Sequence, residues 1–326
     1  MFFALLINIS FGSVSIPFED IFSSLFTERT LKESWSYIIF QYRIPKAITA
    51  ILVGSGLAIS GLLMQTLFRN PLAGPYVLGI SSGASLGVAV LVLGASILGG
   101  SFLSYAYSNI FLSLFASLGA FLVLFAIIIV SRKVKNTMTI LIIGLMFSSL
   151  AAAMISVLAY FSSAQSLQQY LFWSFGSLGN LSWNEIFIFS VFYLIGIVLI
   201  LPTIKPLNSL LLGENYAKSL GINFNKTRNL ILIATSLFTG VITAFSGPIA
   251  FVGLATPHVT KLIFNTSNHK ILIPAVAVTG AIFMLISDTI AQLPNSAFTL
   301  PINAITSLFG APVVIWLLLR KKKIHL

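Results

Sequence analysis

Long apolar segments are the feature that most limits what this 326-residue chain can fold into. Hydrophobic residues make up 57% of the chain and charged residues only 8%, whereas about a quarter of the residues of a soluble domain are charged. Membrane lipid must therefore cover most of the exterior. Segments of about 20 apolar residues cross a bilayer as helices, because a helix satisfies its own backbone hydrogen bonds. We predict an all-α, polytopic membrane protein with a single transmembrane domain over residues 1–326.

Hydropathy predicts about ten membrane-spanning helices. They lie near residues 1–10, 47–68, 76–97, 109–131, 138–161, 186–204, 229–247, 248–264, 271–293 and 302–319. The first is short, because ten helical residues reach only about 15 Å, half of a hydrocarbon layer about 30 Å thick. We expect either a native start further upstream or a partial helix. A cleaved signal peptide is not expected, because no basic residue precedes this segment.

The positions of Lys and Arg predict the orientation of the chain. Cytoplasmic loops are enriched in these residues, and with the C-terminus inside, 14 of the 18 fall on the inner side. The outer side keeps Arg29, Lys32, Arg43 and Lys46. The sequence therefore predicts a multi-pass protein with a cytoplasmic C-terminus, and its net charge of +11 needs no nucleic-acid partner.

One inner loop, at about residues 205–228, is too long for a turn and too polar to span a membrane. Its centre, residues 210–221, is predicted to form a short amphipathic helix between two glycines. Glu214 precedes Lys218 by four residues, which is the favourable order for an ion pair on a helix surface. The composition of this loop fits two interpretations equally well: a solvated connector, or a docking element for a cytosolic partner.

Small residues and prolines predict close packing and breaks in the helices. Gly79, Gly83 and Gly87 repeat every four residues, so they line one helix face and favour close approach of a neighbouring backbone. The two prolines within residues 69–75 must break a helix, and Gly247–Pro248 and Thr256-Pro257-His258 mark further breaks. Broken helices at membrane depth border water-filled cavities or seams between proteins.

Ionisable residues are almost absent from the predicted spans. Asp288 is the only carboxylate inside one, and a charge within the membrane is a functional candidate. No basic neighbour is evident for Asp288, which disfavours a proton relay. A functional role and a structural role as a hydrogen-bond acceptor are equally open for it. Arg43 and Lys46 at the outer mouth suit an acidic partner or an anionic substrate, and contact with lipid headgroups is the simpler alternative.

The sequence contains no catalytic constellation. It has no Gly-rich phosphate loop ending in Gly-Lys-Ser/Thr, so the chain is not expected to hydrolyse ATP. It has no cysteine, no cluster of metal-ligating residues and no nucleophile with an evident base beside it. We therefore expect a transport protein with no metal site and no cofactor, rather than an enzyme.

A series of motifs carries a resemblance to a known family. The motifs are Arg43-Ile-Pro-Lys46, Leu52–Gly61, Asn70–Ala73, Leu78–Gly83, Leu207–Glu214, Ser246–Leu254 with Pro257-His258, and Leu300-Pro301 with Gly310–Pro312. In this order they resemble the FecCD-type permeases, which are type II ABC importers for iron siderophores, heme and cobalamin.

This resemblance implies a subunit of ten helices in the bacterial inner membrane. Its implied partners are a second permease subunit, expected to form a homodimer, two copies of a cytosolic ABC ATPase, and a periplasmic substrate-binding protein. Import would proceed by alternating access, with iron siderophore as the first expected substrate, heme as the second and cobalamin as the third. The alternative is an ion-coupled secondary transporter that works without an ATPase.

The resemblance also implies roles for particular residues. Arg43 and Lys46 would meet acidic residues of the binding protein, although lysine at the second position loses bidentate pairing. Gln292 stands where some members of the family carry a third basic residue. The residues implied in ATPase coupling are Leu212, Gly213, Glu214 and Ala217, and those implied in the cytoplasmic gate are Thr137 and Thr139.

Overall fold

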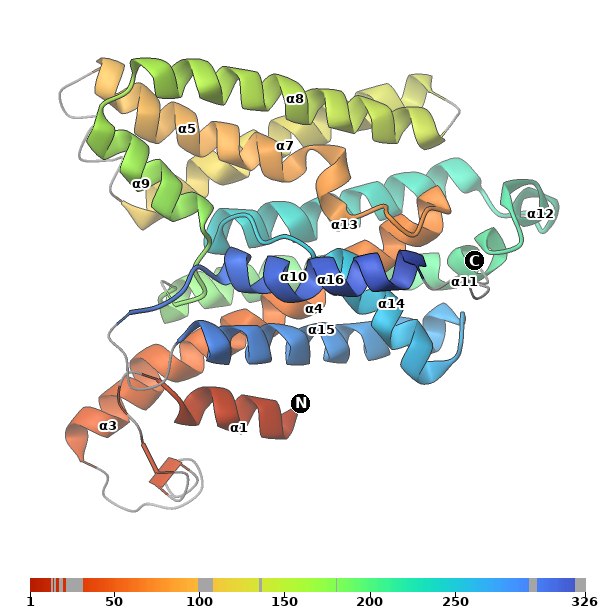
Figure 1. Cartoon of the computed structure of the whole chain (residues 1–326). Coiled ribbons are helices and arrows are strands. Elements are labelled where there is room, and N and C mark those ends of the chain that lie inside the picture. The colour runs from red at the N-terminus through yellow and green to blue at the C-terminus, as the bar shows by residue number, and fades with distance from the viewer. Residues whose placement is uncertain are drawn as a thin grey trace.

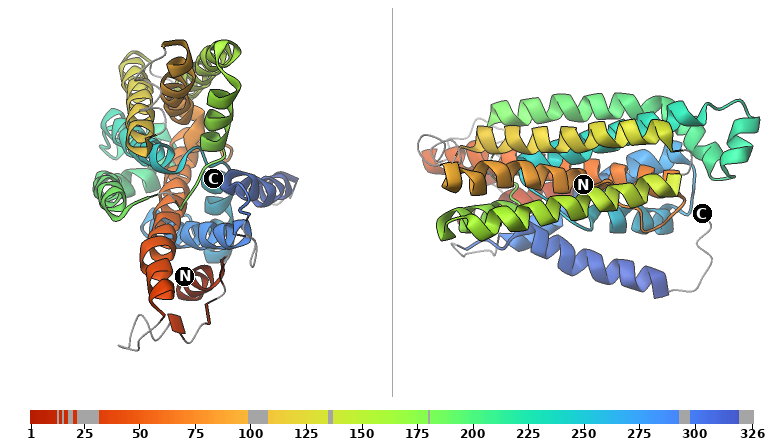
Figure 2. Two further views of the ribbon diagram at one scale, coloured as in Figure 1. Left: turned by 90° about the vertical axis from the view of Figure 1, so that its left-hand side faces the viewer. Right: turned by 90° about the horizontal axis from the view of Figure 1, so that it is seen from above.

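The computed structural model describes residues 1–12, 14, 16–17, 20–21, 32–98, 108–134, 137–179, 181–292 and 298–319. Every regular element within these ranges is helical, which confirms the all-α prediction. The long helices run side by side along one direction (Figure 1). Views from the end and from above show the same alignment (Figure 2), so the molecule is a helical bundle with two ends.

Each of the ten predicted spans contains a helix. These helices are α1 (Phe2–Ser10), α4 (Ile44–Phe68), α5 (Ile80–Leu98), α7 (Asn109–Lys133), α8 (Thr137–Phe161), α10 (Trp183–Ile200), α13 (Phe224–Ser246), α14 (Val252–Phe264), α15 (His269–Ala291) and α16 (Ile302–Leu319). Six of them, α4, α7, α8, α10, α13 and α15, belong to stretches long and apolar enough to cross a membrane in the described part of the chain. The apolar stretches of α5 and α16 are shorter, and α1 and α14 have 9 and 13 residues.

Short helices lie at the two ends of the bundle. α3 (Glu33–Ile38) and α9 (Ala164–Ser174) lie at one end, which we call the outer end. The turn η3 (Leu201–Thr203), α11 (Ile204–Leu210) and α12 (Glu214–Ser219) lie at the other, which we call the inner end (Figure 1). These names follow the orientation predicted from the Lys and Arg residues.

The second span begins earlier than the predicted residue 47. The helix runs without interruption from α3 through a π-helical turn, η1 (Ile39–Arg43), into α4. Pro45 has no backbone N–H and so removes one helical hydrogen bond. π-Helical turns are rare and occur mostly as single turns inside α-helices, and here the turn lies directly before the proline, so the helix widens locally and continues.

Glycines let the central helices touch through their backbones. α4 is buried along most of its length, and a Cβ added to its Gly54 would lie 2.3 Å from the carbonyl oxygen of Gly280 on α15. A Cβ on Gly83 or Gly87 would lie 2.6 or 2.0 Å from a carbonyl oxygen of α7, which confirms the close packing predicted for these two. Gly79 instead precedes α5 and adopts a φ of 76°, so the predicted face of three glycines is reduced to two.

Two of the three predicted breaks are present. The break predicted at Thr256-Pro257-His258 is wrong, because Pro257 lies inside α14. A helix in a membrane tolerates proline where a neighbouring helix satisfies the freed backbone group, and Gln65 Nε2 of α4 lies 3.5 Å from the Gly253 carbonyl oxygen. Residues 69–74 separate α4 from the turn η2 (Pro75–Leu78), and residues 247–251 separate α13 from α14. Two backbone groups at the second break find partners. The Ala250 N–H donates to Asn303 Oδ1 over 3.0 Å, and the Ser177 N–H donates to the Ser246 carbonyl over 2.9 Å. These bonds meet the requirement that backbone polar groups inside a membrane be satisfied.

Candidate functional site

A cavity of about 770 Å³ lies at the outer end of the bundle. Its wall is formed by residues that precede or begin α4, by the end of α15, by residues after α9 and by residues before α16. Arg43, Lys46, Asp288 and Gln292 are among the polar side chains that line it. The structure thus brings two of the four predicted outer cations, Arg43 and Lys46, into one cavity with the only carboxylate predicted inside a span.

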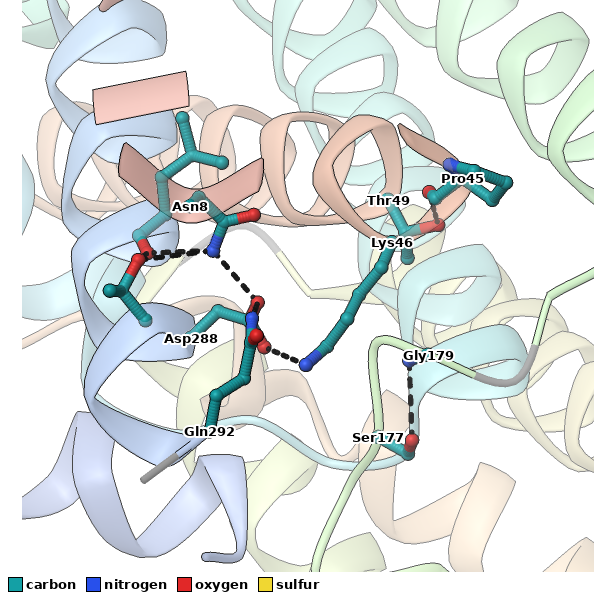
Figure 3. Close-up of polar contacts among 10 residues, drawn as sticks. Asn8, Pro45, Lys46, Thr49, Ser177, Gly179, Asp288 and Gln292 are labelled. Carbon is teal, nitrogen blue, oxygen red and sulfur yellow. Dashed lines mark hydrogen bonds and ion pairs between the residues drawn. The ribbon is translucent and has the colours of Figure 1, made fainter. Parts of the chain in front are cut away.

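Lys46 and Asp288 form an ion pair that joins α4 to α15 (Figure 3). Lys46 Nζ lies 2.9 Å from Asp288 Oδ1, and the two side chains are 21% and 3% exposed. The expectation that Asp288 lacks a basic neighbour is therefore wrong. The partner was missed because it comes from a helix far away in the sequence. The available signal was membrane depth, since both residues lie near the outer ends of their predicted spans.

The second oxygen of Asp288 is also fully engaged. Oδ2 accepts from Asn8 Nδ2 over 2.9 Å and from Gln292 Nε2 over 2.7 Å (Figure 3). Asn8 Nδ2 additionally lies 3.1 Å from Thr289 Oγ1, so α1 is attached to α15 at this point. A buried carboxylate requires a charge partner and hydrogen bonds to offset its lost hydration. Here Gln292 supplies one of those hydrogen bonds.

Arg43 lies in the π-helical turn and binds the backbone at the end of α1. Its Nη1 donates to the carbonyl oxygens of Ile9 and Ser10 over 2.6 and 2.9 Å, and its Nη2 donates to the carbonyl of Val14. The last carbonyls of a helix lack intrahelical donors, so a cation here is favourable. Arg43 is 8% exposed and has no carboxylate partner among the described residues. The docking role of Arg43 and Lys46 stays a prediction.

The segment predicted to couple to an ATPase lies at the inner end (Figure 1). It forms two short helices, α11 and α12, rather than one helix over residues 210–221. Gly213 between them adopts a φ of 113°, a conformation that favours glycine and is incompatible with a continuing helix. Glu214 and Lys218 form the predicted ion pair, with Nζ 2.6 Å from Oε1.

The side chains of this segment divide between solvent and bundle. Leu212 is 67% exposed, whereas Ala217 is fully buried. A large apolar side chain held in solvent beside a left-handed glycine is the kind of group that a partner protein would cover. Coupling by Leu212, Gly213, Glu214 and Ala217 stays a prediction.

The predicted gate residues lie at the start of α8. Thr137 is the first residue of this helix and Thr139 the third, and both side chains are partly buried. Their place at the helix start agrees with the predicted boundary of the fifth span, and their role as a gate stays a prediction. Within the described ranges, no group of three His, Asp or Glu residues could hold a metal ion.

Sequence comparisons assign the family. Residues 1–320 match the FecCD transport family. The chain is 38% identical over 292 residues to the vitamin B12 import system permease protein BtuC of Klebsiella pneumoniae subsp. pneumoniae, covering 87% of this chain and 83% of that protein. It is 35% identical over 286 residues to the protein of the same name from Citrobacter koseri, with coverage of 87% and 84%.

Solved structures share the fold. An inward-facing structure described as a metal-chelate type ABC transporter has a TM-score of 0.83 at 29% identity, covering 97% of this chain and 96% of the other. PsaBC from Streptococcus pneumoniae in complex with Fab has a TM-score of 0.55 at 20% identity, covering 86% and 92%, a likeness of fold alone. The sequence relatives are transport permeases rather than enzymes. The chain therefore belongs to the FecCD transport family and is a multi-pass membrane permease of the ABC-importer type.

Proposed function

We propose that this chain is the membrane-spanning subunit of an importer that carries a metal chelate into the cytoplasm. The observation that carries the proposal is the likeness, over most of the chain, to both a vitamin B12 import permease and a metal-chelate type transporter. Vitamin B12 is itself a bulky chelate of cobalt, so the two names share one substrate class. Iron siderophore, heme and cobalamin are the candidates within that class.

Transport by alternating access is the proposed mechanism. A periplasmic binding protein delivers the chelate at the outer end, and two copies of a cytosolic ATPase supply the energy. The ATPases move the segment that contains α11 and α12, and the path then opens inward between two identical permease subunits. The absence of a phosphate loop from the sequence supports a separate ATPase.

The outer cavity supports docking of an acidic binding protein. Arg43 brings a positive charge to the cavity wall without a carboxylate partner in the described part of the chain. Lys46 remains 21% exposed despite its ion pair. Complementary charges on a partner would steer its approach and fix its orientation. Carboxylates on the binding protein would therefore meet these two residues.

The inner end supports coupling to the ATPase. Leu212 presents an apolar side chain to solvent, Gly213 sets the turn, and Glu214 begins α12 with its charge paired. Ala217 holds α12 against the bundle. Thr137 and Thr139, at the start of α8, are the proposed cytoplasmic gate.

The proposed location is the bacterial inner membrane, with the whole chain as one permease domain and the C-terminus in the cytoplasm. The cations at the end that carries α11 and α12 support this orientation. Those that the structure describes are Arg69, Arg132, Lys133, Lys205, Lys218, Lys226, Arg228, Lys261 and Lys270. Arg29, Lys135, Arg320 and Lys321–Lys323 lie outside the described residues.

The test is purification of the tagged chain from its native host in mild detergent, followed by mass spectrometry of the proteins that remain bound. An ATPase with a phosphate loop should be recovered. Proteoliposomes of the complex should then take up one of the three chelates only with ATP and the binding protein. Uptake driven by a proton or sodium gradient without an ATPase would refute the proposal and favour an ion-coupled carrier centred on Asp288.

A further inference from the structure

The N-terminus of α15 is capped by a side chain from the segment that precedes α12. Asn208 of α11 accepts with its Oδ1 from the backbone N–H of His269 over 2.9 Å. The Nδ2 of Asn208 donates to Asn268 Oδ1 over 3.1 Å, and Asn268 is itself the N-cap residue of α15. The first N–H groups of a helix have no intrahelical partner and are usually capped locally. Here one cap comes from 61 residues away.

The imidazole of His269 extends this connection to α4. Its Nδ1 lies 2.8 Å from Asn208 Oδ1, and its Nε2 lies 2.8 Å from Thr66 Oγ1 near the end of α4. Asn208 Oδ1 can only accept, so Nδ1 carries a proton, and Nε2 of a neutral ring is then an acceptor. The single proton of the Thr66 hydroxyl is shared between this Nε2 and the Leu62 carbonyl oxygen, which lies 2.9 Å from Thr66 Oγ1. His269 and Thr66 are 1% and 5% exposed. Water therefore cannot readily replace either bond.

We call Asn208, His269 and Thr66 the inner clamp, because together they tie α11 to both α15 and α4. The same two long helices are joined at two further levels. Their backbones touch where Gly54 meets Gly280, and the ion pair described above joins them at the outer end. Helices in contact at three levels cannot slide past one another without breaking packed and polar contacts.

We infer that the inner clamp positions the coupling segment on the α4–α15 pair, so that movement of α11 and α12 is transmitted to the walls of the outer cavity. Asn208, His269 and Thr66 are positioning residues in this scheme, since they act through the elements that they join. The inference rests on the coupling role proposed above and specifies the route by which coupling reaches the docking site.

A transmission role differs measurably from a purely structural one. Loss of a structural bond lowers stability and affects all activities alike. Loss of transmission lowers the stimulation of ATP hydrolysis by the loaded binding protein, while hydrolysis without the binding protein stays unchanged. The ratio of stimulated to basal hydrolysis is therefore the quantity to measure in the complete reconstituted transporter.

The variants are Asn208→Leu, which removes the amide, and Thr66→Val, which removes only the hydroxyl. We expect the stimulation to fall about tenfold for Asn208→Leu and about threefold for Thr66→Val. The first variant breaks three hydrogen bonds of the inner clamp, whereas the second breaks one, to His269. Thr66→Ser keeps the hydroxyl and should restore the stimulation. Ser209→Ala is the matched control on α11, since its hydroxyl reaches only the Lys205 carbonyl, at 3.4 Å.

A distance measurement tests the clamp without any transport activity. The chain has no cysteine, so spin labels can be placed at Tyr216→Cys on α12 and Lys270→Cys on α15, both at exposed positions. We expect one narrow distance distribution in the otherwise unchanged chain and a broad one when Asn208→Leu is added. Unchanged elution and thermal unfolding would show that this variant still folds.

The two proposals fail in different ways. The inner clamp would be overturned by a narrow distance distribution in the Asn208→Leu chain. It would also be overturned if the binding protein stimulated ATP hydrolysis as strongly in the Asn208→Leu variant as in the Ser209→Ala control. A transporter whose ATP hydrolysis never responds to the binding protein, with the distance broadened as expected, would leave the clamp in place and contradict the proposed coupling.

Discussion

Replacement of Lys46 by methionine is expected to destabilise the protein more than replacement of Asp288 by asparagine. Both residues line the outer cavity, but the Asp288 side chain is only 3% exposed and has little contact with water, whereas the Lys46 side chain is 21% exposed and can hydrate its ammonium group. Removing one partner of a buried pair costs about 3–5 kcal/mol. Asn8 and Gln292 still donate to the carboxylate when Lys46 is lost.

The expected loss in the free energy of unfolding follows from these contacts. For Lys46→Met we expect a loss of about 3 kcal/mol, at the low end of the range for a buried pair. For Asp288→Asn we expect about 1–2 kcal/mol, the cost of weakened hydrogen bonds with a lysine that remains hydrated. The double variant should be more stable than Lys46→Met alone, with a coupling energy of about 2 kcal/mol, as residues in direct contact show.

Denaturant titration of the four proteins in mixed detergent micelles measures these differences. Lys270→Met, at an exposed lysine on the same helix, is the control, and it should stay within about 0.5 kcal/mol of the unchanged protein. The reasoning fails if Asp288→Asn costs as much as Lys46→Met. It also fails if the double variant loses as much stability as the two single variants together.

Three further predictions concern packing, the attachment of α1 and the coupling segment. Gly61→Ala should cost about 3 kcal/mol by overpacking, since its Cβ would lie 1.7 Å from a carbonyl oxygen on α14. A Cβ added at Gly94 would have no neighbouring atom within 4 Å, so Gly94→Ala should change stability by no more than about 1 kcal/mol. Equal losses of stability in the Gly61→Ala and Gly94→Ala variants, measured by denaturant titration, would contradict the overpacking. Arg43→Lys keeps the charge but not the fork that holds the end of α1, so added protease should cleave near α1 faster, and an unchanged rate would refute the attachment. Leu212→Ala should weaken binding of the ATPase to the permease about tenfold through lost apolar burial. Leu220→Ala, at a similarly exposed leucine, should leave this affinity unchanged. Equal affinity of the two variants for the ATPase would exclude Leu212 as a contact.

The sequence predicted the helices well because hydropathy reports directly on the cost of placing polar groups in lipid. All ten apolar segments contain a helix in the structure. The ion pair between Glu214 and Lys218 was also predictable, since residues four apart on a helix must be neighbours. These features depend only on local spacing or on composition.

Features that depend on packing between helices far apart in the sequence were harder to predict. The partner of Asp288 comes from α4, and only a comparison of depth in the membrane would have pointed to Lys46. The backbone carbonyls that bind Arg43 leave no signal, because every residue carries one. The division of the inner segment at Gly213 depends on a positive φ, and a glycine permits that conformation without requiring it.

The unbroken helix from α3 to α4 has a mechanical consequence. It contains 36 residues, which corresponds to a length of about 54 Å, while the hydrocarbon layer measures only about 30 Å. The α3 end accordingly projects beyond the neighbouring helices (Figure 1). A tilt of about 5° at the inner end of such a rod would move its far tip by about 5 Å. A protein resting on α3 would thus stand on a stiff lever arm, and small rotations inside the membrane would reach it enlarged.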